Sequence, residues 1–139
     1  MGVSKREVVR ELARLAAELP ETRWLVVIGK DGLPKAGFPE FIVEPDRISA
    51  MGAAMISLGE RISGELQGGD FRYAALGGSL GAVLVVVLDG KTVLKIGLNP
   101  EAPVDGVMAG LGRSIEPLLR TLKIPAIPEW LARKGREDR

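Results

Sequence analysis

The chain has 139 residues, of which 46% are hydrophobic and 27% charged, a composition that favours one ordinary globular domain. Its formal net charge of +1 and aromatic content of 4% argue against a nucleic-acid binder, which needs a clustered basic surface or a base-stacking platform. Cysteine and histidine are both absent, which removes disulfides, thiolate catalysis, most structural zinc sites and the commonest general base.

Local signals mark the first helix and the first two strands. Ser4-Lys5-Arg6-Glu7 matches a capping box and predicts the start of a helix. Trp24 to Ile28 is a continuous apolar run, typical of a central strand covered on both faces. Asp31-Gly32 is a turn dipeptide that leads into a short strand near Leu33 to Phe38. Prolines in and after this strand cannot donate ladder hydrogen bonds, so we expect it at a sheet edge.

The segment from Pro45 to Leu66 predicts a long helix with two different apolar faces. Bulky residues recur at steps of three and four and form one stripe: Ile48, Met51, Met55, Leu58, Ile62 and Leu66. A nearly smooth face lies beside this stripe and consists of Ser49, Gly52, Ile56, Gly59 and Ser63. Glycine inside a helix costs roughly 1 kcal/mol against alanine, so close approach of another backbone is favoured over drift at tolerant sites. We expect the bulky stripe to face the core of the chain and the smooth face to meet a partner.

Three strands and a helix follow. Phe71 to Leu76 predicts a half-exposed strand, whose open edge needs a partner or a cover. Ala82 to Leu88 is a second apolar central strand, and a hairpin turn leads from it into Val93 to Leu98. A final helix begins near Pro103, and Pro117 must kink or split it because proline removes a backbone hydrogen bond.

The predicted order is therefore αββαβββα, an α+β fold with a five-stranded antiparallel sheet and helices on both faces. The domain covers residues 4–122. Residues 123–139 form a C-terminal tail that is either flexible or docked through Ile127, Trp130 and Leu131.

Motifs of enzymes and cofactor binders are weak in this sequence. Gly77-Gly78-Ser79-Leu80-Gly81 fits the pattern of a hydrolase nucleophile elbow, but it leads into a strand and no histidine can take the serine proton. Gly90-Lys91-Thr92 resembles only the end of a phosphate-binding loop. Lys95 is interpreted as a snorkelling or strand-end lysine rather than a Schiff-base nucleophile. We expect no catalytic, cofactor-binding or metal-binding residues and no enzymatic activity.

Other features indicate where the protein works. The N-terminus carries charges where a secretory signal needs an apolar run, and no apolar segment is long enough to span a membrane, so the cytoplasm is expected. Asn99 and Gln67 are the only side-chain amides, and such scarcity of thermolabile residues fits a protein from a hot environment.

The segment Leu25–Phe38, with its Asp31-Gly32-Leu33-Pro34-x-Ala36 turn, and the Ala- and Gly-rich helix that follows carry a family likeness. Together with the order of the later elements, they resemble the roadblock/dynein light chain family over about residues 4–122. The motifs are structural, so they specify a roadblock/profilin-like fold better than a task. Pro117 departs from a regular family helix, and the tail lies outside the match.

The resemblance implies a homodimer in which the third strands pair edge to edge and the two middle helices lie against each other. The implied dimer interface consists of Gly52, Ile56, Gly59, Ser63, Phe71 and Tyr73. Proteins of this kind commonly regulate or scaffold small Ras-like GTPases without enzymatic chemistry, and the candidate partner contacts here are Arg47, Arg61 and Glu65. The alternative is a small-ligand sensor on a profilin-like or GAF-like sheet, for which polar groups that could orient a ligand are few.

Overall fold

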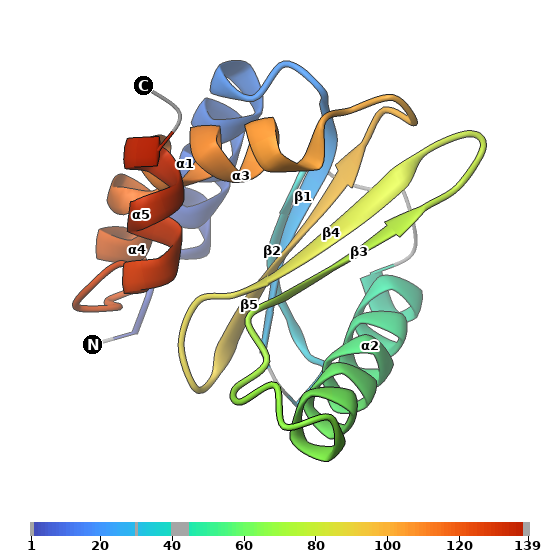
Figure 1. Cartoon of the computed structure of the whole chain (residues 1–139). Coiled ribbons are helices and arrows are strands. Elements are labelled where there is room, and N and C mark those ends of the chain that lie inside the picture. The colour runs from blue at the N-terminus through green and yellow to red at the C-terminus, as the bar shows by residue number, and fades with distance from the viewer. Residues whose placement is uncertain (1, 30, 40–44, 138–139) are drawn as a thin grey trace.

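The computed structural model describes residues 2–29, 31–39 and 45–137. In chain order its elements are α1 (Lys5–Glu18), β1 (Thr22–Gly29), β2 (Pro34–Phe38), α2 (Pro45–Glu65), β3 (Tyr73–Gly77), β4 (Ala82–Val87), β5 (Thr92–Leu98), α3 (Val104–Ser114), α4 (Glu116–Thr121) and α5 (Glu129–Glu137). The α+β class and the predicted order are confirmed through β5 and α3 (Figure 1). No helix in the described ranges is both long and apolar enough to cross a membrane.

The five strands form one antiparallel sheet in the order β2-β1-β5-β4-β3. The two continuous apolar runs became β1 and β4, which have a strand on each side, and β5 lies buried between them. The proline-bearing β2 and the half-exposed β3 are the two edges, as predicted. Strands that are covered on both faces have continuous apolar sequences, and for this reason β1 and β4 could be predicted from the sequence.

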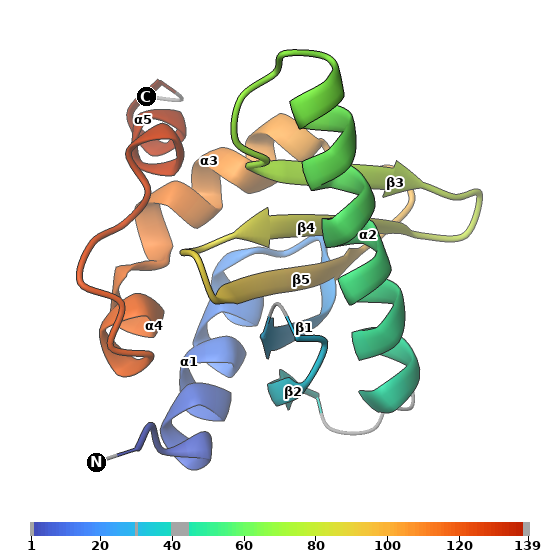
Figure 2. The ribbon, with the colours of Figure 1, turned by 90° about the horizontal axis from the view of Figure 1, so that it is seen from below.

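The helices lie on both faces of the sheet, and they are divided unequally. Figure 2 shows α2 alone on one face, with α1, α3, α4 and α5 on the other. The larger core lies on the crowded face, where Leu12, Leu94 and Leu111 are fully buried. The smaller core lies under α2 and centres on four buried residues: Ile28, Ile56, Val85 and Val93.

Local signals also set the helix ends. Ser4 Oγ accepts a hydrogen bond from the Glu7 backbone N–H at 3.3 Å, so the predicted N-cap is in place. Pro117 splits the last predicted helix, because α3 ends at Ser114 and α4 begins at Glu116.

The C-terminal tail segment forms α5, which is the docked alternative. Leu131 is fully buried, and the α5 backbone packs directly on α3. At this crossing a Cβ atom added to Gly112 would lie 2.9 Å from the backbone nitrogen of Gly135, so glycine permits the close contact. The division of the chain at residue 122 stays a prediction.

Candidate functional site

The outward face of α2 carries a row of exposed apolar side chains. Four of the six predicted stripe residues lie on it, and each is about half exposed or more: Met51, Leu58, Ile62 and Leu66. Met55 is partly buried, and the side chain of Ile48 lies outside the described part of the structure. On β3, Leu76 is exposed too, and it lies on the α2 side of the sheet because it pairs with Val83. Exposed apolar patches of this kind mark sites of protein association.

The smooth face of α2 packs on the sheet of its own chain. Ile56 is only 2% exposed and belongs to the core under α2. A Cβ added to Gly52 would lie 2.5 Å from Cδ1 of Ile28, and one added to Gly59 would lie 2.6 Å from the ring of Phe71. Gly52 and Gly59 therefore leave room for side chains of their own chain, and not for the backbone of a partner helix as predicted. The two faces of α2 are thus exchanged relative to the prediction, with Ser63 partly buried at the same side.

The remaining predicted interface residues lie at β3. Phe71 is half-buried against α2, where its ring fills the space that Gly59 leaves. Tyr73 points to the other face of the sheet and stacks on Trp130 of α5, with ring centroids 5.7 Å apart. In the part of the chain that the structure describes, β3 pairs with β4 alone, so its outer edge is open.

The predicted partner contacts lie exposed on α2 but do not form one cluster. Arg61 Nε donates to Glu65 Oε1 at 3.2 Å, and both side chains are largely exposed. Arg47 lies fourteen residues before Arg61, or about 21 Å along the helix at 1.5 Å per residue. These charges flank the row of apolar side chains as a polar rim.

Lys95 lies beneath α2 in the middle of the sheet. It is only 3% exposed, in register with Val26 on one side and Val85 on the other. The structure therefore places it inside the strand and not at a strand end. Burial lowers the pKa of its ammonium group from the ordinary value of 10.5.

The lowered pKa of Lys95 predicts a pH-dependent stability. Between the native pKa and 10.5 the unfolded chain binds more protons at this residue, so the free energy of unfolding rises with pH. We expect the stability of the wild type, relative to Lys95→Met, to increase as the pH is raised from about 7 toward 10.5. Urea denaturation at several pH values measures this difference. Lys91→Met, at an exposed turn position, serves as the control, and an equal pH dependence in both variants would contradict the assignment.

The two motifs that suggested loop chemistry both lie in hairpin turns. Ser79 lies between β3 and β4, and Lys91 lies between β4 and β5. A nucleophile elbow and a phosphate-binding loop each need a strand followed by a helix. Both turns lead into strands instead, so neither motif has the setting that its chemistry needs. The exposed surface of α2 and β3 is therefore taken as the candidate site.

The sequence grouped four residues into one stripe that was predicted to face the core, whereas the structure leaves all four exposed: Met51, Leu58, Ile62 and Leu66. Their charged neighbours gave a signal, because Arg61 and Glu65 occur in the same turns as Ile62 and Leu66. Charged side chains stay in water, so the stripe beside them is held at the surface, whereas the face of glycine and serine carries no charge and can be buried.

No sequence-family model matches the chain, and no curated protein sequence matches it. The structure, in contrast, is similar to MglB from Myxococcus xanthus, with a TM-score of 0.76 over 88% of this chain and 92% of that chain at 9% identity. It is similar to the gliding protein mglB from Thermus thermophilus, with a TM-score of 0.73 over 88% and 93% at 17% identity. A roadblock/LC7 domain from Streptomyces avermitilis gives 0.68 over 83% and 91% at 21% identity. The chain has the roadblock/LC7 fold, as expected from the resemblance.

Proposed function

We propose that this protein is a non-catalytic, homodimeric scaffold or regulator that binds a small Ras-like GTPase in the cytoplasm. The observation that carries the proposal is the exposed apolar row on α2, which lies on the same side of the sheet as Leu76 of the open-edged β3. The roadblock/LC7 fold supports the type of partner, through the family resemblance of the sequence. One structurally similar MglB is described in a tetrameric arrangement, which supports self-association in this fold.

The dimer would use both parts of this surface. The outer edge of β3 offers backbone N–H and C=O groups that a second β3 can pair with, extending the sheet across two chains. A two-fold axis would then bring α2 of each copy toward the other, with Leu58 and Ile62 in the contact. This revises the expected interface: the bulky face of α2 meets the second copy, whereas Gly52, Ile56 and Gly59 hold α2 to its own sheet.

The GTPase would bind beside the paired helices, where the charged rim lies. Arginine suits such contacts because its planar guanidinium makes two hydrogen bonds to a carboxylate. Neither Arg47 nor Arg61 is proposed as a catalytic group, and no enzymatic chemistry is assigned to the chain.

The double substitution Arg47→Ala and Arg61→Ala is expected to preserve the fold while weakening GTPase binding. The Arg61–Glu65 pair is largely exposed, so its loss costs at most about 1 kcal/mol of stability. Each roughly 1.4 kcal/mol removed from the complex weakens binding tenfold. Calorimetry against the cognate GTPase measures the affinity. The control is Arg10→Ala, which changes an exposed arginine of α1 on the opposite face of the sheet. Equal losses of GTPase affinity in both variants would show that the contact surface is not the rim of α2.

The proposal is tested with Ras-like GTPases of the native organism, each loaded with GDP or with a non-hydrolysable GTP analogue. We expect saturable binding by calorimetry to at least one of them, with affinity that depends on the nucleotide. Absence of binding in both nucleotide states across the set would contradict the proposal.

A further inference from the structure

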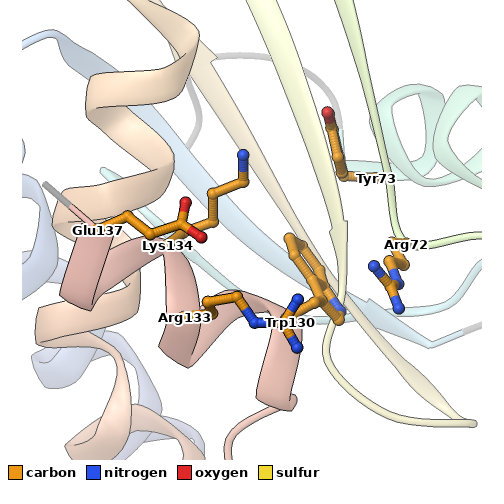
Figure 3. Close-up of a pocket in the computed structure, with 6 residues that line it drawn as sticks. All are labelled: Arg72, Tyr73, Trp130, Arg133, Lys134 and Glu137. Atoms are coloured by element: carbon orange, nitrogen blue, oxygen red, sulfur yellow. The ribbon is translucent and has the colours of Figure 1, made fainter.

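A hollow of about 270 Å³ lies between the start of β3 and helix α5. Six side chains line it: Arg72, Tyr73, Trp130, Arg133, Lys134 and Glu137. Figure 3 shows Arg72 and Tyr73 on the strand side of Trp130, whereas Arg133, Lys134 and Glu137 extend from α5 on its other side. Residues more than fifty positions apart in the sequence thus meet at one site.

The walls of the hollow are held in place by packing. The rings of Tyr73 and Trp130 stack with an interplanar angle of 25°. Leu131 anchors α5 in the core, and Arg113 Nη1 donates to the backbone oxygen of Gly135 at 3.3 Å. The hollow is therefore a preformed feature where side chains of α5 reach the start of the edge strand.

The charges around the hollow are unbalanced. Arg72, Arg133 and Lys134 contribute three positive charges and Glu137 one negative charge, a net of two positive charges. Within the described ranges, none of these four groups forms an ion pair within 4.0 Å. Arg136, on the same helix, differs because it pairs with Glu129 at 2.8 Å. An excess of cationic side chains around a concave site creates a positive potential that attracts an anion.

We propose that this hollow binds a small molecule that carries a phosphate monoester. A phosphate monoester has a charge of about −1.5 to −2 near neutral pH, which matches the net charge of the hollow. The guanidinium groups of Arg72 and Arg133 can each take two phosphate oxygens, and Lys134 adds a point charge. The Tyr73–Trp130 pair offers an apolar wall for the body of the ligand. The volume lies just below the usual range of ligand pockets, roughly 300–1,000 Å³, so it favours a small ligand.

The site goes beyond the proposed GTPase platform, and it begins at β3, the strand whose outer edge the proposed dimer uses. Tyr73 is in register with Val86, which belongs to the core on the face opposite α2. The hollow and the exposed row of α2 therefore lie on different faces of the sheet, so loss of GTPase binding in the α2 variants and loss of phosphate binding in the α5 variants are separate outcomes.

A titration of the full-length ¹⁵N-labelled chain with phenyl phosphate tests the inference. We expect saturable shifts of the Trp130 indole N–H signal and of α5 amides. Inorganic phosphate is expected to shift the same signals with lower affinity, because it lacks the ring. Phenyl sulfate, with a single charge, is expected to bind more weakly than phenyl phosphate.

Matched variants on α5 make the test specific. Arg133→Gln is expected to weaken phenyl phosphate binding about tenfold, as for the loss of one charge-assisted hydrogen bond. Arg136→Gln makes the same charge change on the same helix and is expected to leave the affinity unchanged, since Arg136 does not line the hollow. Both positions are exposed, so the amide spectrum should show that each variant stays folded. No saturable shift at these residues, or equal weakening by both variants, would overturn the site.

Discussion

Ile56→Arg is expected to destabilise the fold by about 3–5 kcal/mol, and not simply to separate two copies of the chain. Ile56 is 2% exposed and packs in one cluster with Ile28, Val85 and Val93 beneath α2. A guanidinium group placed there would be a buried charge, on the same side of the sheet as the buried Lys95. Chemical denaturation measures the free energy of unfolding.

Ser57→Arg is the matched control for this prediction. Ser57 is the next residue on α2, is exposed and lies outside the apolar row, so the same new charge stays in water and should change the free energy of unfolding little. If Ile56→Arg were as stable as Ser57→Arg, the face of α2 that packs on the sheet would have been assigned wrongly.

The double substitution Leu58→Arg and Ile62→Arg is expected to dissociate the proposed dimer while leaving each chain folded. In a two-fold interface the same patch meets itself, so both new charges would face like charges of the other copy. Like-charge contacts across an interface cost several kcal/mol, which raises the dissociation constant at least about a hundredfold. Sedimentation velocity measures the populations of monomer and dimer.

The control for the dimer variant adds the same two charges elsewhere on α2. Ser57 and Gly64 are both exposed and lie outside the apolar row, and a Cβ added to Gly64 would meet no atom within 4 Å. Ser57→Arg with Gly64→Arg should leave the dimer intact. Dissociation by both pairs of substitutions would point to general charge repulsion and not to a defined interface.

Most of the fold could be predicted from the sequence, because its signals are local. β1 and β4 were visible as apolar runs, and Pro34 indicated that β2 is an edge strand. The break between α3 and α4 follows directly from Pro117. None of these features depends on how the layers are stacked.

The orientation of α2 could not be predicted in the same way. Helical periodicity groups residues into faces, but it does not say which face lies on the sheet. Gly52 and Gly59 allow close approach of any neighbour, and only the tertiary structure shows that these neighbours are Ile28 and Phe71. The two glycines are needed because side chains pack closely against them, but those side chains belong to the same chain and not to a second copy as predicted.

The hollow beside α5 was beyond sequence reasoning for a different reason. Its walls come from the edge strand and from a tail segment that follows two prolines, Pro125 and Pro128. Only the long-range contacts of Leu131 with the core and of Trp130 with Tyr73 bring them together. The sequence indicated Trp130 as a docking residue of the tail, but nothing in it pointed to Tyr73 as its partner.

Self-association through the outward face of α2 is the central claim, and light scattering on the unmodified chain at micromolar concentration tests it most directly. The proposed dimer predicts a mass twice the chain mass of 14.8 kDa. A mass of 14.8 kDa at that concentration would contradict it, because the apolar row of α2 and the edge of β3 would then remain open to water.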